Sequence, residues 1–65
     1  METRDTIRRL LEEDGKLLVS FRAHAGYYRV PLKDAALCAK IREAASNGKE
    51  ISFTHDRDLT ISRIG

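Results

Sequence analysis

Apolar residues recur along the chain with two different periods, one typical of helices and one typical of strands. Over residues 2–14, Ile7, Leu10 and Leu11 fall on one stripe at helical spacing, and charged residues occupy most of the remaining positions. Gly15 follows, at the place where a helix commonly ends in a left-handed residue. The pattern predicts an amphipathic helix over residues 2–14.

After this segment the period changes to two. Alternating apolar positions predict a strand over residues 16–24, and Ala25 and Gly26 follow as a tight turn. Residues 27–32 resume the alternation and complete a hairpin. Pro31 must lie at the end of its strand or at a sheet edge, because it has no N–H to donate to a ladder.

The second half of the chain repeats the order of a helix followed by a hairpin. Asp34 is a good N-cap for a helix that reaches about Ser46 and is ended by Asn47 and Gly48. Residues 51–54 and 59–62 then alternate as two short strands, joined by the polar residues 55–58.

The predicted order is α-β-β-α-β-β over one small domain, residues 1–65, with short connections. We expect a two-layer α+β fold, in which a four-stranded antiparallel sheet carries both helices on one face. A small, partly closed OB-like barrel is the alternative, because two hairpins flanking a helix can also curl around it.

Two short segments resemble parts of known domain families. The run from Tyr27 to Leu32, together with Gly48 to Thr54, is similar to the strand, helix and hairpin portion of small oligomer-forming OB-like domains. Residues 41–54 resemble the helix-to-strand opening of WYL-type ligand-sensing domains, although the Trp-Tyr-Leu triplet of that family is absent. Neither likeness includes a diagnostic site, so neither implies a function.

The chain is short, and this limits its core. A domain of 65 residues buries only about 60% of the surface that its unfolded chain exposes. Its single cysteine, Cys38, rules out an intrachain disulfide and favours a reducing compartment. The chain shows neither a signal-peptide core nor an apolar run of membrane-spanning length, so we expect a cytoplasmic protein.

The residues offer little for catalysis, metal binding or cofactor binding. His24 and His55 are isolated, whereas zinc sites need three or four ligands at close spacing. Asp56 and Asp58 lack the glycine and distal glutamate of a calcium loop, and aspartates in tight turns bond their own backbone. Cys38 lies in an apolar stretch, which favours a packed small side chain over a nucleophile. We therefore expect no enzyme activity, no cofactor and no small-molecule substrate.

The charge is nearly balanced at +2, and the excess lies in the first half. Residues 1–33 hold seven basic and five acidic side chains, and residues 34–65 hold five of each. A nucleic-acid-binding module is one hypothesis, because arginines beside aromatic residues hold phosphates and stack on bases. Its contact set would be Arg4, Arg8, Arg9, Arg22, Arg29 and Lys33. The acidic residues of the first segment oppose it.

The leading hypothesis is a small non-catalytic interaction protein. The predicted strands carry more apolar residues than one helical layer covers, so we expect a protein partner, a homodimer or both. Such a protein would act as an accessory, regulator or inhibitor. The expected protein-binding residues are Leu18, Tyr27, Tyr28, Val30 and Ile64.

Overall fold

Asp14 and Gly15 form a two-residue turn between two antiparallel strands. In the computed structural model, which describes residues 2–64, these residues have φ values of 50° and 73°. Two successive positive φ angles define the type I′ turn that joins tightly paired antiparallel strands, and Asp-Gly is one of its preferred sequences. The turn connects β1 (Glu2–Glu13) to β2 (Lys16–Phe21), with Glu13 directly opposite Lys16.

The predicted helix over residues 2–14 is therefore wrong, because this segment is strand β1. Ile7 pairs with Phe21 and Arg9 with Ser20, so one extra residue, Arg8, forms a β-bulge. Because of the bulge, the next inward position after Ile7 is Leu10 and not Arg9. A strand interrupted by one bulge thus places apolar residues three apart, which is also the spacing of a helix.

The remaining elements exist as predicted, with two shifts: the strand predicted over residues 16–24 ends at Phe21, so residues 22–26 form a loop in place of a tight turn, and the last strand begins at Ile61 and not at residue 59. The elements after β2 are β3 (Tyr27–Pro31), α1 (Ala35–Asn47), β4 (Glu50–His55) and β5 (Ile61–Ile64). Asp34 caps α1 by accepting a hydrogen bond from Leu37 N at 3.2 Å, and Gly48 ends it in the left-handed conformation at φ 66°. Pro31 is the last residue of an edge strand, as expected.

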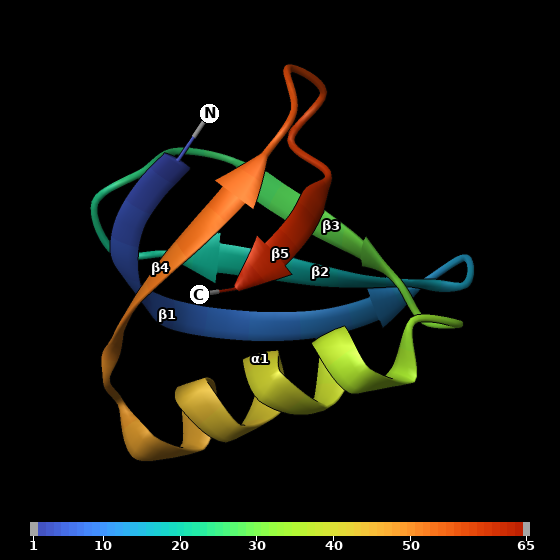
Figure 1. Cartoon of the computed structure of the whole chain (residues 1–65), viewed down its shortest axis with the longest axis horizontal. Coiled ribbons are helices and arrows are strands. Elements are labelled where there is room, and N and C mark those ends of the chain that lie inside the picture. The colour runs from blue at the N-terminus through green and yellow to red at the C-terminus, as the bar shows by residue number, and fades with distance from the viewer. Residues whose placement is uncertain (1, 65) are drawn as a thin grey trace.

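The architecture corrects the expected fold class. Residues 2–64 form one helix and a five-stranded antiparallel sheet of order β3-β2-β1-β4-β5, so the four-stranded sheet with two helices on one face is wrong. The sheet curls until its two edges meet at a bridge between Arg29 and Thr60, where Arg29 N donates to Leu59 O at 2.9 Å (Figure 1). A five-stranded curled sheet with its helix between β3 and β4 is an OB-type barrel.

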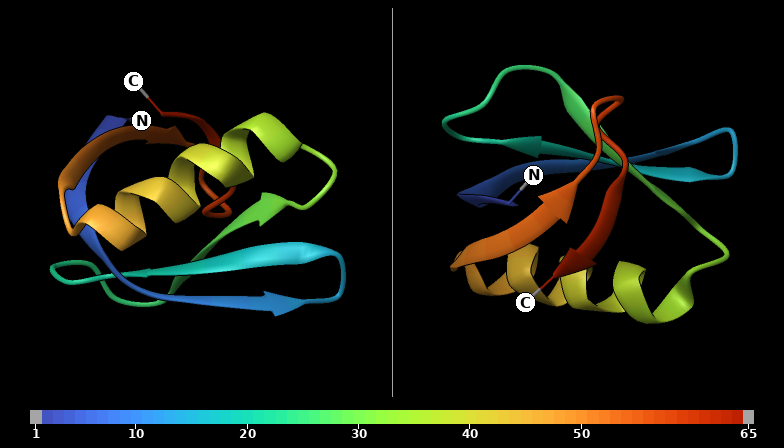
Figure 2. Two further views of the ribbon diagram at one scale, coloured as in Figure 1. Left: turned by 90° about the horizontal axis from the view of Figure 1, so that it is seen from below. Right: turned by 45° about the horizontal axis from the view of Figure 1, so that its top comes forward.

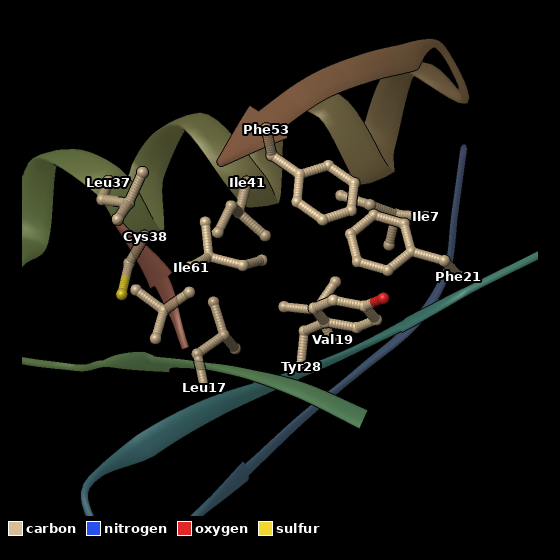
Figure 3. Packing of buried hydrophobic residues seen from close by; sticks show 11 residues of the cluster. Ile7, Leu17, Val19, Phe21, Tyr28, Leu37, Cys38, Ile41, Phe53 and Ile61 are labelled. Atoms are coloured by element: carbon tan, nitrogen blue, oxygen red, sulfur yellow. The ribbon is translucent and has the colours of Figure 1, made fainter. Parts of the chain in front are cut away.

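The curled sheet encloses one core, and α1 packs along one side of it (Figure 2). Phe21 and Phe53 stack at 4.4 Å between ring centroids, and Tyr28 meets both rings edge-on (Figure 3). Leu37, Cys38 and Ile41 bring the buried face of α1 against this cluster. Across the described residues, no helix is long and apolar enough to cross a membrane.

Candidate functional site: the three-strand face

The outer surface of β1, β2 and β3 is one face whose residues are set by the strand register. Cross-strand neighbours in an antiparallel sheet point to the same side, and successive residues alternate between sides. Leu17, Val19, Tyr28 and Val30 point into the core, so the residues between them point outward. We call this outer surface the three-strand face. Its residues form three rows: Arg9, Ser20 and Tyr27; Leu11, Leu18 and Arg29; Glu13, Lys16 and Pro31.

The centre of the three-strand face is apolar. Leu11 lies directly opposite Leu18 across the β1–β2 ladder. Leu11 is 44% exposed and Tyr27 is 37% exposed, and these are the large apolar side chains most accessible to solvent among the described residues. Leu18 is half-buried by its neighbours. Leu11, Leu18 and Tyr27 thus bring apolar surface together on one face, and contiguous apolar surface is where partners bind.

Charged residues surround this apolar centre. Arg9 lies in the first row and Arg29 at the end of the middle row, while Glu13 and Lys16 flank the β1–β2 turn. OB-folds bind oligonucleotides and oligosaccharides on the face of strands 2 and 3 and on the loops between strands 1 and 2 and between strands 4 and 5. The three-strand face of this chain includes the outer side of β2 and β3.

The β4–β5 turn, beside Arg29, is held by side-chain hydrogen bonds to its own backbone. The Asp56 carboxylate accepts hydrogen bonds from Asp58 N and Thr60 N, both at 3.1 Å, so it serves the turn itself. The pKa of Asp58 is lowered mainly by its hydrogen bond with the Asp56 side chain and then by Thr60, with a smaller effect from the charge of Arg29. Within residues 2–64, no three His, Cys, Asp or Glu side chains are grouped to hold a metal ion.

A buried carboxylate fixes the β2–β3 loop. Asp5 is 5% exposed and accepts hydrogen bonds from Thr6 N at 2.6 Å, Ala23 N at 2.9 Å and His24 Nδ1 at 2.5 Å. Burial acts to raise the pKa of Asp5, but the hydrogen bond from His24 and those from the two backbone N–H groups outweigh it, and the pKa is lowered. The pair therefore serves to hold the loop in place.

His55 is a core residue. Its Nδ1 donates to the Asp56 carbonyl at 2.9 Å, so its Nε2 accepts from the Thr3 hydroxyl at 3.0 Å. Its ring also meets Tyr28 edge-on at 5.0 Å between centroids. These contacts give both ring nitrogens a structural role.

Cys38 is packed rather than presented to solvent. It is 5% exposed and its thiol donates to the Pro31 carbonyl at 3.5 Å. Burial raises the pKa of this thiol, and the charge of Arg42 only partly opposes that effect. A thiol held in its protonated form is a poor nucleophile.

The predicted protein-binding residues do not form one patch. Leu18 and Tyr27 lie on the three-strand face, as a contact role requires. Tyr28 and Val30 are 5% and 0% exposed, so they belong to the core and offer no surface to a partner. Ile64 lies on β5, away from the face, beside a groove of about 300 Å³ that also involves Ile51 and the last turns of α1.

The predicted nucleic-acid-binding residues are also spread over the surface. Arg9 and Arg29 share the three-strand face, and Arg8 occupies the bulge beside it. The other three lie elsewhere. Arg4 pairs with β4, 4.0 Å from the Glu50 carboxylate, and Arg22 and Lys33 lie in loops.

The sequence pattern did not identify Leu11 as a surface residue, because the predicted helix placed Leu11 on its buried side. The signal that identifies it is the Asp14-Gly15 pair. This dipeptide between two alternating segments indicates a type I′ hairpin, and counting back from the turn places Leu11 opposite Leu18.

Comparison with known proteins identifies likenesses in structure alone. No protein-family model matches the chain, and no curated protein is significantly similar in sequence. The fold is similar to crystal structures of pro- protein-glutaminase (TM-score 0.80, 19% identity) and of its A47Q2 mutant (TM-score 0.81, 17% identity). Each match covers 94% of this chain and 23% of the other. At this identity and coverage the likeness establishes the fold and transfers no activity.

Proposed function

We propose that this chain is a small non-catalytic protein-binding domain whose partner docks on the three-strand face. The observation that carries the proposal is the exposed Leu11 beside the half-buried Leu18 at the centre of the sheet surface. Such a domain acts by bridging or blocking its partner, as an accessory, regulator or inhibitor. We place its action in the cytoplasm, because its single cysteine suits a reducing compartment.

The composition of the face supports a protein partner. Binding energy at protein interfaces concentrates in aromatic and arginine side chains at a desolvated centre, with charged residues at the rim. Tyr27 and Arg29 adjoin the leucine pair, and Glu13 and Lys16 lie at the margin. The three-strand face therefore combines an apolar centre with a polar edge.

Nucleic-acid binding is the second candidate, because Arg9, Arg29 and Tyr27 share this face. It predicts an affinity for single-stranded oligonucleotides that falls steeply with salt and that weakens when both arginines are replaced by glutamine. The leucine pair and Glu13 favour a protein partner. A flat titration at low salt contradicts the nucleic-acid candidate.

A position-specific cross-link tests the proposed function. A photoreactive amino acid is placed at Ser20, within the face, and in a second variant at Ser46, on the exposed side of α1. In cells, the probe at Ser20 is expected to give a discrete protein adduct, and the probe at Ser46 is not. Leu18→Asp should remove the adduct, and Leu18→Met should keep it.

The outcomes separate the two candidates. A protein adduct that depends on Leu18 supports the proposed function, and an RNA adduct supports the second candidate. Equal adducts from Ser20 and Ser46 contradict both candidates, and a protein adduct that survives Leu18→Asp in a folded variant contradicts the proposed function. If Leu18→Asp fails to fold, Leu11→Lys replaces it, since Leu11 is the more exposed of the pair.

A further inference from the structure

The first and third rows of the three-strand face carry complementary side chains. On each strand, the residue two positions before the middle row complements the residue two positions after it. On β1 these are Arg9 and Glu13, on β2 Ser20 and Lys16, and on β3 Tyr27 and Pro31. Each pair is favourable when its members meet: an ion pair, a hydrogen bond, and an aromatic ring on a proline.

A two-fold axis brings the complementary residues of two copies together. The axis lies in the plane of the interface, runs perpendicular to the strands and passes over Leu11. Rotation about it places each strand of the second copy antiparallel to the same strand of the first. Arg9 of one copy then lies over Glu13 of the other, and the reverse contact forms as well, since residue 11 is the midpoint of the two positions. Leu11 and Leu18 meet their own counterparts. A surface of this kind is self-complementary, which is what a two-fold interface requires.

We propose that the three-strand face pairs with the same face of a second copy of this chain, across a two-fold axis over Leu11. This inference rests on the proposed function, in which that face binds protein. Arg29 would meet its own counterpart at the end of the middle row. The acidic β4–β5 turn lies beside Arg29, so each copy brings a negative charge close to this contact.

The face offers Leu11 and Leu18 as its main apolar contacts, so we expect a weak, reversible dimer. Interface area alone does not set affinity. We take a dissociation constant on the order of 10–100 µM as the range that the experiment must cover. The dimer must be measured across that range of protein concentration.

Charge reversal with mixing tests the proposal. Arg9→Glu places two acidic residues at each end contact, and Glu13→Arg places two basic ones, so each variant alone is expected to dimerise at least about tenfold more weakly than the original chain. An equimolar mixture pairs acid with base at both contacts. Sedimentation should therefore show that the mixture recovers a dimer although neither variant forms one alone.

Matched controls come from the exposed side of α1. Lys40→Glu and Glu43→Arg introduce the same charge changes away from the face, and both variants should dimerise like the original chain. The proposal is overturned if the original chain stays monomeric up to about 1 mM, well above the expected dissociation constant. It is also overturned if mixing recovers no dimer, or if the control variants lose it too.

The results of this experiment and of the cross-linking experiment can contradict the two proposals independently. If the original chain is monomeric but the Ser20 probe still captures a different protein in a Leu18-dependent manner, the self-association inference is wrong and the proposed function stands. If the chain is monomeric and the Ser20 probe captures no protein, both are wrong.

Discussion

The Asp5 carboxylate on β1 accepts a hydrogen bond from His24 Nδ1, 19 residues away in the β2–β3 loop. The same carboxylate accepts from Ala23 N, so one buried side chain anchors the loop that leads into β3. The loop directly precedes Tyr27, and the position of β3 on the three-strand face therefore depends on this anchor.

Asp5→Asn should destabilise the domain by about 1–3 kcal/mol, because an amide has a single acceptor oxygen and leaves a buried N–H without a partner. The pKa of Asp5 in the folded state lies below its ordinary value of 3.8. Its stabilising effect is therefore complete above about pH 4 and is lost as the pH falls through the folded-state pKa. Urea unfolding from pH 7 to pH 2.5 measures this dependence, which should be smaller in Asp5→Asn. Parallel curves for the two proteins contradict the assignment.

Phe21→Ala should cost about 3–5 kcal/mol, because it removes one ring of the stack with Phe53 and leaves a cavity against Tyr28. A domain of this length has a total stability of roughly 3–10 kcal/mol, so the variant should be largely unfolded at 37 °C. Circular dichroism on heating checks this. Tyr27→Ala is the matched control, since it truncates the exposed neighbour of Tyr28 and should leave the midpoint nearly unchanged.

Gly15→Ala should destabilise the domain by about 1 kcal/mol. Nothing lies within 4 Å of the position of an added Cβ, so the cost comes from the φ of 73° and not from a clash. The denaturant midpoint should fall without a change in the slope of the transition. Gly15→Asn should recover most of the loss, because asparagine tolerates positive φ. If Gly15→Asn is no more stable than Gly15→Ala, the turn assignment is wrong.

Cys38 should react slowly with a disulfide reagent while the protein is folded, because burial and a raised pKa keep it as a protected thiol. Unfolding in urea should expose it and raise the rate by orders of magnitude. The rate below the unfolding transition then reports the opening of the domain. A native rate equal to that of the unfolded chain contradicts the packing of Cys38 against β3.

The local elements of the second half follow from the sequence because their signals are short in range. Asp34 and Gly48 bound α1 through hydrogen bonds and a backbone angle that depend on nearby residues. The alternation of Leu17, Val19 and Phe21 likewise identifies the inward face of β2. These patterns are set by the chain itself, within a few residues.

Strand β1 could not be identified by its hydrophobic spacing alone. A bulge at Arg8 changes an alternating strand into a pattern with helical spacing, and the bulge also bends the strand as the sheet curls. The tertiary structure also decided which apolar residues are covered. Tyr28 and Val30 are sealed by closure of the barrel, whereas Leu11 and Leu18 stay outside because pairing across β1 and β2 points them away from the core.

The sequence by itself determined the caps of α1 and the alternation of β2, β3 and β4, since each rests on local backbone geometry. The tertiary structure decided the fifth strand, the closure between β3 and β5, and the composition of the three-strand face. The physical reason is that burial depends on which strands become neighbours. That choice is made by packing over the whole chain.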